Sequence, residues 1–130
     1  MEHLDIYKCD ICGNIVQLMI VGGGELVCCG KVMNKLEPKS HEDSIMEKHV
    51  PIFIDNTENL EIRVGEILHP MNNEHYIMFI QAISEDKTTV QTKFLYPDQE
   101  PKMFLNSGFN CKFAREYCNI HGLWENIYDK

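Results

Sequence analysis

The stretch that decides the fold covers residues 109–128 and reads FNCKFAREYCNIHGLWENIY. In its first half, apolar residues alternate with polar ones, as expected of a half-buried β-strand: Phe109, Cys111 and Phe113. This predicted strand ends at Cys118, and a tight turn containing His121 leads into a second strand over residues 123–128. The stretch therefore predicts an antiparallel pair of strands whose connection carries both a cysteine and a histidine.

The same β pattern extends back from this pair as far as His49. Clusters of turn-forming residues separate five further predicted strands, which cover residues 49–54, 60–68, 75–83, 88–96 and 102–105. Nothing in the chain predicts a helix beyond one turn around residues 43–47. Seven short antiparallel strands at this spacing predict an immunoglobulin-like β-sandwich over residues 49–130. The fold class is therefore mainly β.

Ahead of the sandwich, residues 1–36 predict a separate small module. Four of the six cysteines lie there, among many turn formers: Cys9, Cys12, Cys28 and Cys29. A segment this short contains too little apolar sequence to build a core, and such segments usually depend on a metal or a disulfide. The polar, unpatterned residues 37–48 follow, with the boundary near Glu37, and they predict a linker.

The spacing of the four cysteines, C-x2-C and then an adjacent pair, is typical of a tetrahedral site made of four thiolates. Soft thiolates favour both zinc and iron, and the spacing leaves that choice open. Two structural disulfides and a plain zinc ribbon are the alternatives. A zinc ribbon usually carries a second C-x2-C pair, whereas here Cys28 and Cys29 are adjacent, so the tetrahedron is expected to be distorted.

A second group of metal-ligating residues belongs to the predicted sandwich. If consecutive strands run up and down, five such residues fall at the same end of the domain: His49, His69, His75, Cys118 and His121. This convergence predicts a second metal site. Cys111 alternates with two phenylalanines and is expected to be a small buried residue of the core. His3 and His41 lie in polar stretches and are expected to be solvated.

Charge and composition exclude several classes of protein. The 130 residues contain 12 Lys and Arg against 20 Asp and Glu, a formal net charge of −8. Nucleic acids and anionic membranes both need a basic surface, so neither is an expected partner. No apolar run approaches the roughly 18 residues of a membrane span. The first residues do not resemble a signal peptide, which predicts a cytoplasmic protein with reduced cysteines.

These motifs resemble those of the desulfoferrodoxins, the two-iron superoxide reductases, over nearly the whole chain. In the first module, Tyr7-Lys8-Cys9-x2-Cys12-Gly13 and Cys28-Cys29 resemble the desulforedoxin motif. In the sandwich, the matching motifs are Glu47-Lys48-His49-Val50-Pro51, His69-Pro70-Met71, His75-Tyr76 and Cys118-Asn119-Ile120-His121-Gly122-Leu123-Trp124. The motifs occur in order, and no ligand position departs from the family pattern.

The resemblance implies two iron ions per chain, one bound by the four cysteines of residues 1–36. It implies that the second lies among four histidines in one plane, His49, His69, His75 and His121, with Cys118 on the axis and a sixth position open. The activity implied is the one-electron reduction of superoxide to hydrogen peroxide, with electrons from a donor such as rubredoxin. A homodimer is also implied.

Two charged residues beside His49 acquire roles through the same resemblance. Lys48 is expected to guide superoxide to the iron, and Glu47 to occupy the sixth position of oxidised iron. Because the net charge of −8 repels an anion, attraction of superoxide requires local positive charge. The alternatives to an enzyme are a non-enzymatic iron electron-transfer protein and a zinc-ribbon module that binds a partner.

Overall fold

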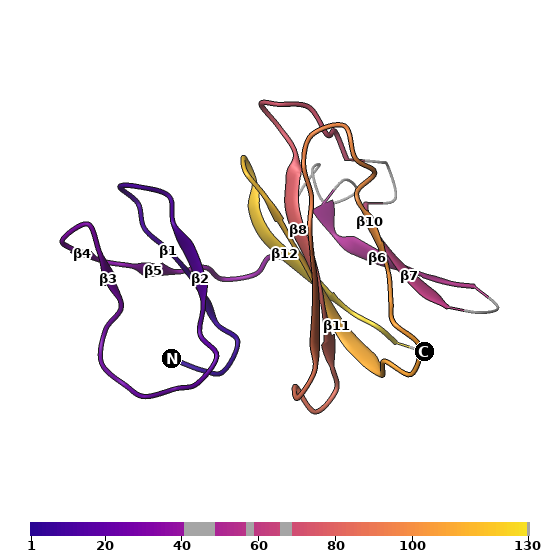
Figure 1. The fold of residues 1–130 in the computed structure, drawn as a ribbon, viewed down its shortest axis with the longest axis horizontal. Coiled ribbons are helices and arrows are strands. Elements are labelled where there is room, and N and C mark those ends of the chain that lie inside the picture. The colour runs from indigo at the N-terminus through magenta and orange to yellow at the C-terminus, as the bar shows by residue number, and fades with distance from the viewer. Residues whose placement is uncertain (41–48, 57–58, 66–68, 130) are drawn as a thin grey trace. The chain divides into compact units, whose positions relative to one another are not determined.

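The chain folds into two compact units, Met1–Glu37 and Pro38–Lys130 (Figure 1). The structure is a computed structural model that describes residues 1–40, 49–56, 59–65 and 69–129. Each unit is built from β-strands and turns. Within the described residues, no helix is long and apolar enough to cross a membrane.

The first unit contains five very short strands. An antiparallel sheet in the order β2-β1-β5 contains β1 (Ile6–Lys8), β2 (Ile15–Gln17) and β5 (Asn34–Lys35). A separate antiparallel pair contains β3 (Val27–Cys28) and β4 (Lys31–Val32). One cluster of buried residues in this unit joins Tyr7, Cys9 and Met33, with a few half-buried neighbours, and Leu4 and Ile6 are buried as well. So small a core supplies little stabilisation, which agrees with the predicted dependence on a metal.

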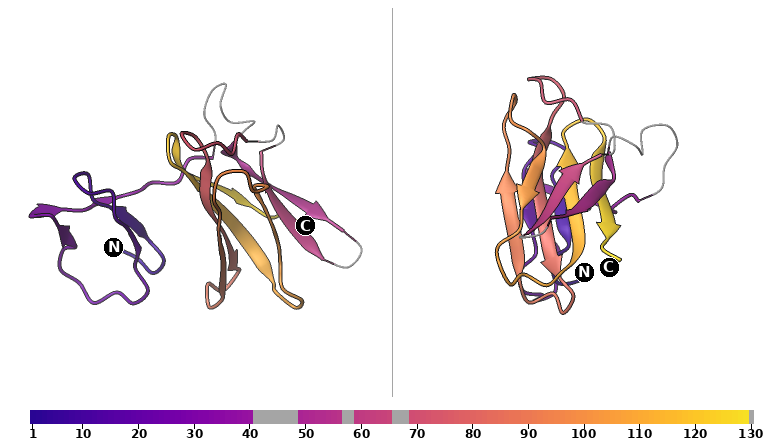
Figure 2. Two further views of the ribbon diagram at one scale, coloured as in Figure 1. Left: turned by 45° about the horizontal axis from the view of Figure 1, so that its top comes forward. Right: turned by 90° about the vertical axis from the view of Figure 1, so that its right-hand side faces the viewer.

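The second unit is a sandwich of two antiparallel sheets. One sheet has the strand order β10-β7-β6 and the other β12-β11-β8-β9. The strands are β6 (Pro51–Asp55), β7 (Leu60–Val64), β8 (Ile77–Ser84), β9 (Val90–Phe94), β10 (Lys102–Phe104), β11 (Cys111–Cys118) and β12 (Gly122–Ile127). The two sheets face each other, as Figure 2 shows, with β6 in contact with β11 and β12 across the interface. The predicted mainly-β sandwich is confirmed.

Each of the seven predicted strands overlaps one observed strand, and the differences lie at the ends. The strand predicted over residues 60–68 ends at Val64, and residues 66–68 lie outside the described part of the chain. The helical turn predicted around residues 43–47 also lies outside it. The hairpin of β11 and β12 follows the prediction from residues 109–128 closely, and the two strands pair from Phe113 with Ile127 to Cys118 with Gly122.

The core of the sandwich lies between the sheets and includes Ile62, Val64, Ile77, Ile80, Ala114 and Cys111. Cys111 is therefore a buried core residue, as predicted. The expected alternation does not extend to Phe113, because the pairing of β11 with β8 shifts between Cys111 and Phe113. Such a shift, a β-bulge, changes which residues face the core. Phe113 is half-buried outside the core, with the Lys87 ammonium over its ring.

Candidate metal centres

The four cysteines of the first unit lie together, with all four sulfur atoms within 4.8 Å of one another. The Sγ atoms of Cys12 and Cys28 are 3.6 Å apart, and those of Cys28 and Cys29 are 4.0 Å apart. A tetrahedral thiolate site with bonds of about 2.3 Å has edges of about 3.8 Å. All six cysteines are free thiols, so the structure does not contain the two disulfides that were the alternative. The sulfur positions fit a tetrahedral metal ion.

Two tight turns bring these sulfurs together. In the first, the Gly13 amide donates to the Cys9 carbonyl at 3.0 Å, and Gly13 has a positive φ of 82°. In the second, Cys29 itself has a positive φ of 53°, an uncommon conformation for a residue with a Cβ atom. The adjacency of Cys28 and Cys29 therefore has a conformational cost, which falls on Cys29.

The different proton affinities of the four thiols give a second reason to expect a cation. Hydrogen bonds, the largest from the Cys12 backbone amide, lower the pKa of the Cys9 thiol to about 6. Interactions with the Cys12, Cys28 and Cys9 sulfurs raise the pKa of Cys29 to about 12. Four thiolates therefore do not form together unless a positive ion compensates them, and metal binding deprotonates such ligands.

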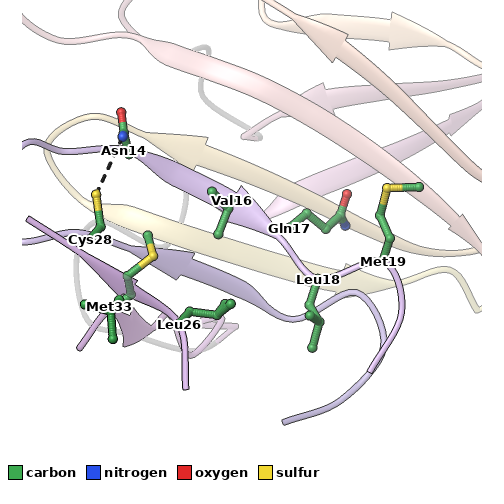
Figure 3. A pocket seen from close by; sticks show the side chains of 9 residues that line it. Asn14, Val16, Gln17, Leu18, Met19, Leu26, Cys28 and Met33 are labelled. Carbon is green, nitrogen blue, oxygen red and sulfur yellow. Dashed lines mark hydrogen bonds between the residues drawn. The ribbon is translucent and has the colours of Figure 1, made fainter. Parts of the chain in front are cut away.

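An open apolar groove adjoins Cys28 in the same unit (Figure 3). Its volume is about 480 Å³, and its lining includes Val16, Leu18, Met19, Leu26, Val27 and Met33. At its edge the Asn14 side-chain amide donates to the Cys28 sulfur at 3.7 Å, the dashed contact in Figure 3. Met19 is 72% exposed and Val27 59%, so this apolar surface faces outward.

The second group lies at one end of the sandwich. Its ligand atoms, also within 4.8 Å of one another, come from His49, His75, Cys118 and His121. The pairing of Cys118 with both Ile77 and Gly122 brings the beginnings of β8 and β12 to the end of β11. The Nε2 atom of His49 lies 2.9 Å from Nδ1 of His121, so these two nitrogens face each other. Imidazole and thiolate together are suitable ligands for zinc or iron.

His69 lies beside this group. Its ring centroid is 4.5 Å from that of His49 and 4.7 Å from that of His75. The Nδ1 atom of His69 is 2.6 Å from the Pro70 carbonyl, a contact in which Nδ1–H donates. This hydrogen bond selects the tautomer in which Nε2 carries the lone pair that a metal requires.

Glu116 supports His49 from inside the core, and sequence reasoning missed it. Its Oε2 atom lies 3.2 Å from His49 Nδ1, and both side chains are buried. Burial raises the pKa of the Glu116 carboxyl well above its usual value. Burial, followed by the neighbouring imidazoles, lowers the pKa of His49 to about 3, so His49 is neutral at pH 7. A signal was available, because Glu116 lies two residues before Cys118 and thus on the same face of its strand.

The indole of Trp124 covers one face of His49. The two rings are stacked, with centroids 5.0 Å apart and planes 13° apart, and Trp124 is fully buried. Its Nε1–H donates to the His121 carbonyl at 3.1 Å. The side chain of Lys39 reaches the same place: Nζ donates to the same carbonyl at 3.3 Å and lies 5.4 Å from the indole centroid.

Asn119 connects the loops that carry His75 and Cys118. Its Oδ1 accepts from the Tyr76 amide at 3.0 Å, and its Nδ2 donates to the Glu74 carbonyl at 3.0 Å. Burial, the largest influence, raises the pKa of the Cys118 thiol, and hydrogen bonds from the backbone amides of His121 and Ile120 partly oppose this rise. The turn therefore positions the sulfur and supplies donors to a thiolate.

The structure describes one of the four remaining predicted residues. Glu47, Lys48 and His41 lie outside the described residues. His3 is exposed, as predicted, and its Nδ1 lies 2.8 Å from the Met19 carbonyl.

Comparison with known proteins bears on both centres. The desulfoferrodoxin family model matches residues 41–127, and the desulfoferrodoxin N-terminal domain model matches residues 1–36. A desulfoferrodoxin of Desulfarculus baarsii is 43% identical over 124 residues, which cover 95% of this chain and 96% of the relative. A superoxide reductase of Pyrococcus horikoshii is 35% identical over 97 residues, covering 62% of this chain and 84% of the relative.

Among solved structures, the superoxide reductase from Treponema pallidum superposes with a TM-score of 0.73 at 24% identity, covering 95% of this chain and 97% of that one. This likeness supports the fold. Two family models account for nearly all of the sequence, and a relative above 40% identity spans almost all of both chains. The chain belongs to the desulfoferrodoxin family.

Proposed function

We infer that this chain is a superoxide reductase, which converts superoxide to hydrogen peroxide. The observation that carries the inference is the meeting of three imidazoles and one thiolate at one end of the sandwich, with ligand atoms within 4.8 Å of one another. The relatives named superoxide reductase support the same activity. The reaction joins one superoxide, one electron and two protons to form one hydrogen peroxide.

Iron is the metal we propose for both centres. Cys9, Cys12, Cys28 and Cys29 would hold one ion, and the second would be held by a set of five: His49, His69, His75, His121 and Cys118. His69 joins the set as a proposal, based on its ring contacts with His49 and His75. Ferrous iron, when bound there, supplies the electron, and a thiolate ligand increases the electron density available for that transfer.

The protein orients the ligands, excludes water from them and sets the net charge of the centre. Glu116 and the Pro70 carbonyl hold the rings of His49 and His69 with Nε2 directed toward the centre. The buried indole of Trp124 excludes water from one face of His49. Backbone amides of the turn after Cys118 stabilise its thiolate. Neutral imidazoles leave the ferrous centre with net positive charge, which favours an anionic substrate.

Lys48 is proposed to attract superoxide to this centre, because the net charge of −8 opposes the approach of an anion. Replacing Lys48 with alanine should slow the reaction with superoxide and flatten its dependence on ionic strength, while iron content stays the same. Pulse radiolysis at several salt concentrations measures this. An unchanged rate would exclude the role.

Glu47 is proposed as a ligand that would bind the iron in its oxidised state. Glu47→Ala should therefore change the visible spectrum of the ferric protein and leave the first encounter with superoxide nearly unchanged. A ferric spectrum identical to that of the wild type would exclude ligation by Glu47.

Three further proposals concern the electron donor, the oligomeric state and the cellular location. The electron donor is proposed to be a small redox protein such as rubredoxin. A homodimer is proposed, supported by the outward-facing apolar groove of the first unit, and sedimentation velocity decides between monomer and dimer. A cytoplasmic location is proposed because six free cysteines suit a reducing compartment.

The proposed function is tested by metal analysis and rapid kinetics on the purified protein. We expect two irons per chain, oxidation of the reduced protein by superoxide in a stopped-flow instrument, and peroxide formed without release of oxygen. Oxygen release would indicate a dismutase. A colourless protein holding only zinc would falsify the assignment in favour of a zinc-ribbon module, and an iron protein inert to superoxide would indicate an electron carrier.

A further inference from the structure

Lys39 lies outside every motif that predicted the catalytic centre, yet its side chain reaches that centre. The residue belongs to the second unit and joins its sheet: its backbone amide donates to the Leu123 carbonyl, and its carbonyl accepts from the Glu125 amide, both at 2.9 Å. This bridge alongside β12 fixes the backbone of Lys39 next to the strand that begins just after His121.

The ammonium group is held at the edge of the ligand cluster. Nζ donates to the His121 carbonyl at 3.3 Å and lies over the indole of Trp124, which stacks on His49. The carbonyl oxygen and Nδ1 of one histidine are at most about 5 Å apart, so Nζ lies within about 8 Å of the His121 ligand nitrogen. The charge of Lys39 acts on His49 as well, as one of several groups that lower its pKa.

The charge of Lys39 is also accessible, and no described carboxylate neutralises it. The residue is exposed, and within the described ranges no carboxylate lies within ion-pair distance of its Nζ. In a chain with a net charge of −8, an exposed cation held beside the ligands creates the local positive field that an anionic substrate requires.

We propose that Lys39 is an anion-attracting residue of the catalytic centre, a fixed positive charge at its edge that raises the local concentration of superoxide. This inference rests on the proposed function and adds to it a residue outside the sequence motifs. Two unit charges about 8 Å apart in water change an equilibrium by a factor of about two, and by more where protein displaces water. The expected contribution of Lys39 is therefore about two- to three-fold.

The test compares two neutral variants, one charge-conserving variant and a matched control. Lys39→Gln and Lys39→Met remove the charge, and Lys39→Arg retains it. Lys112→Gln makes the same change in net charge at the other end of β11, six residues and about 20 Å from Cys118. Two readouts apply to the iron-loaded proteins: the rate constant for superoxide, and the affinity of the ferric protein for azide by visible titration.

At low ionic strength, both neutral Lys39 variants should lose about two- to three-fold in rate and in azide affinity. This difference should fade at about 0.5 M salt, where charges are screened within a few ångströms. Lys39→Arg and Lys112→Gln should remain close to wild type, and iron content should be unchanged throughout.

Four results would overturn the proposal. An equal loss in Lys112→Gln would show that the overall charge acts rather than Lys39. An equal loss in Lys39→Arg, or a loss that persists at high salt, would show a structural role. Wild-type values in both neutral variants would show no role at all. If wild-type protein does not react with superoxide, the proposed function fails, while the azide affinities still decide the role of Lys39.

Discussion

Replacing Cys118 with serine is expected to reduce the rate of superoxide reduction by at least about 100-fold. Loss of a group that only supports a metal ligand typically costs 10- to 100-fold, and Cys118 is itself the proposed ligand. Serine is a hard oxygen donor that is not ionised at pH 7, so it removes both the soft ligand and its negative charge. Stopped-flow mixing of the reduced variant with superoxide measures the loss.

The visible spectrum shows whether the loss arises at the intended centre. Cys118→Ser should abolish the ferric thiolate band of the histidine-containing centre and keep the absorption of the four-cysteine centre. Cys111→Ser is the matched control, because Cys111 is a buried cysteine at the opposite end of the same strand. The control should keep both irons and wild-type activity. A Cys118→Ser protein that retains the band would show that this cysteine does not bind the metal.

Residues 109–128 show why so much of this centre can be predicted from sequence. Strand direction has only two values, so counting strands places His75, Cys118 and His121 at one end of the sandwich without knowledge of any distance. The structure confirms that these three meet, together with His49. Alternation along a strand is equally discrete, and it places Cys111 in the core correctly.

Predictions from the sequence fail where the structure depends on packing contacts rather than on the alternation of residues along a strand. The bulge between Cys111 and Phe113 inserts one residue into β11 and reverses the alternation, and no residue in the stretch marks its position. Lys39 lies in a polar segment that was predicted to be a linker, and only its bridge to β12 brings it to the centre. Sequence reasoning identifies ligands by residue type, whereas supporting groups such as Asn119 are identified by contacts.

Glu116 is another supporting group that is identified by its contacts and not by its residue type. Its replacement has the second large expected effect. Replacing Glu116 with leucine should weaken iron binding at the histidine-containing centre by about 10- to 100-fold, the usual cost of losing a partner behind a metal-binding histidine. The carboxyl Oε2 atom accepts from His49 Nδ1 inside the core, and no other acceptor for that nitrogen is found among the described residues. Competition with a chelator, followed by the visible spectrum, measures the affinity of this centre.

Stability separates the positioning role of Glu116 from a purely structural one. Its Oε1 atom is buried and has no hydrogen-bond partner within the described chain, so the carboxyl is costly to bury. Leucine removes this cost but leaves the buried Nδ1–H of His49 without an acceptor, and because these two effects oppose each other, metal-free Glu116→Leu should unfold at a denaturant concentration close to that of the wild type. Glu116→Gln, which keeps an acceptor for Nδ1–H, should retain most of the affinity, and Glu125→Gln on the neighbouring strand should retain all of it. If leucine lowers stability and leaves metal affinity intact, Glu116 is a core residue that does not orient His49; if affinity falls while stability holds, the buried carboxylate positions the ligand.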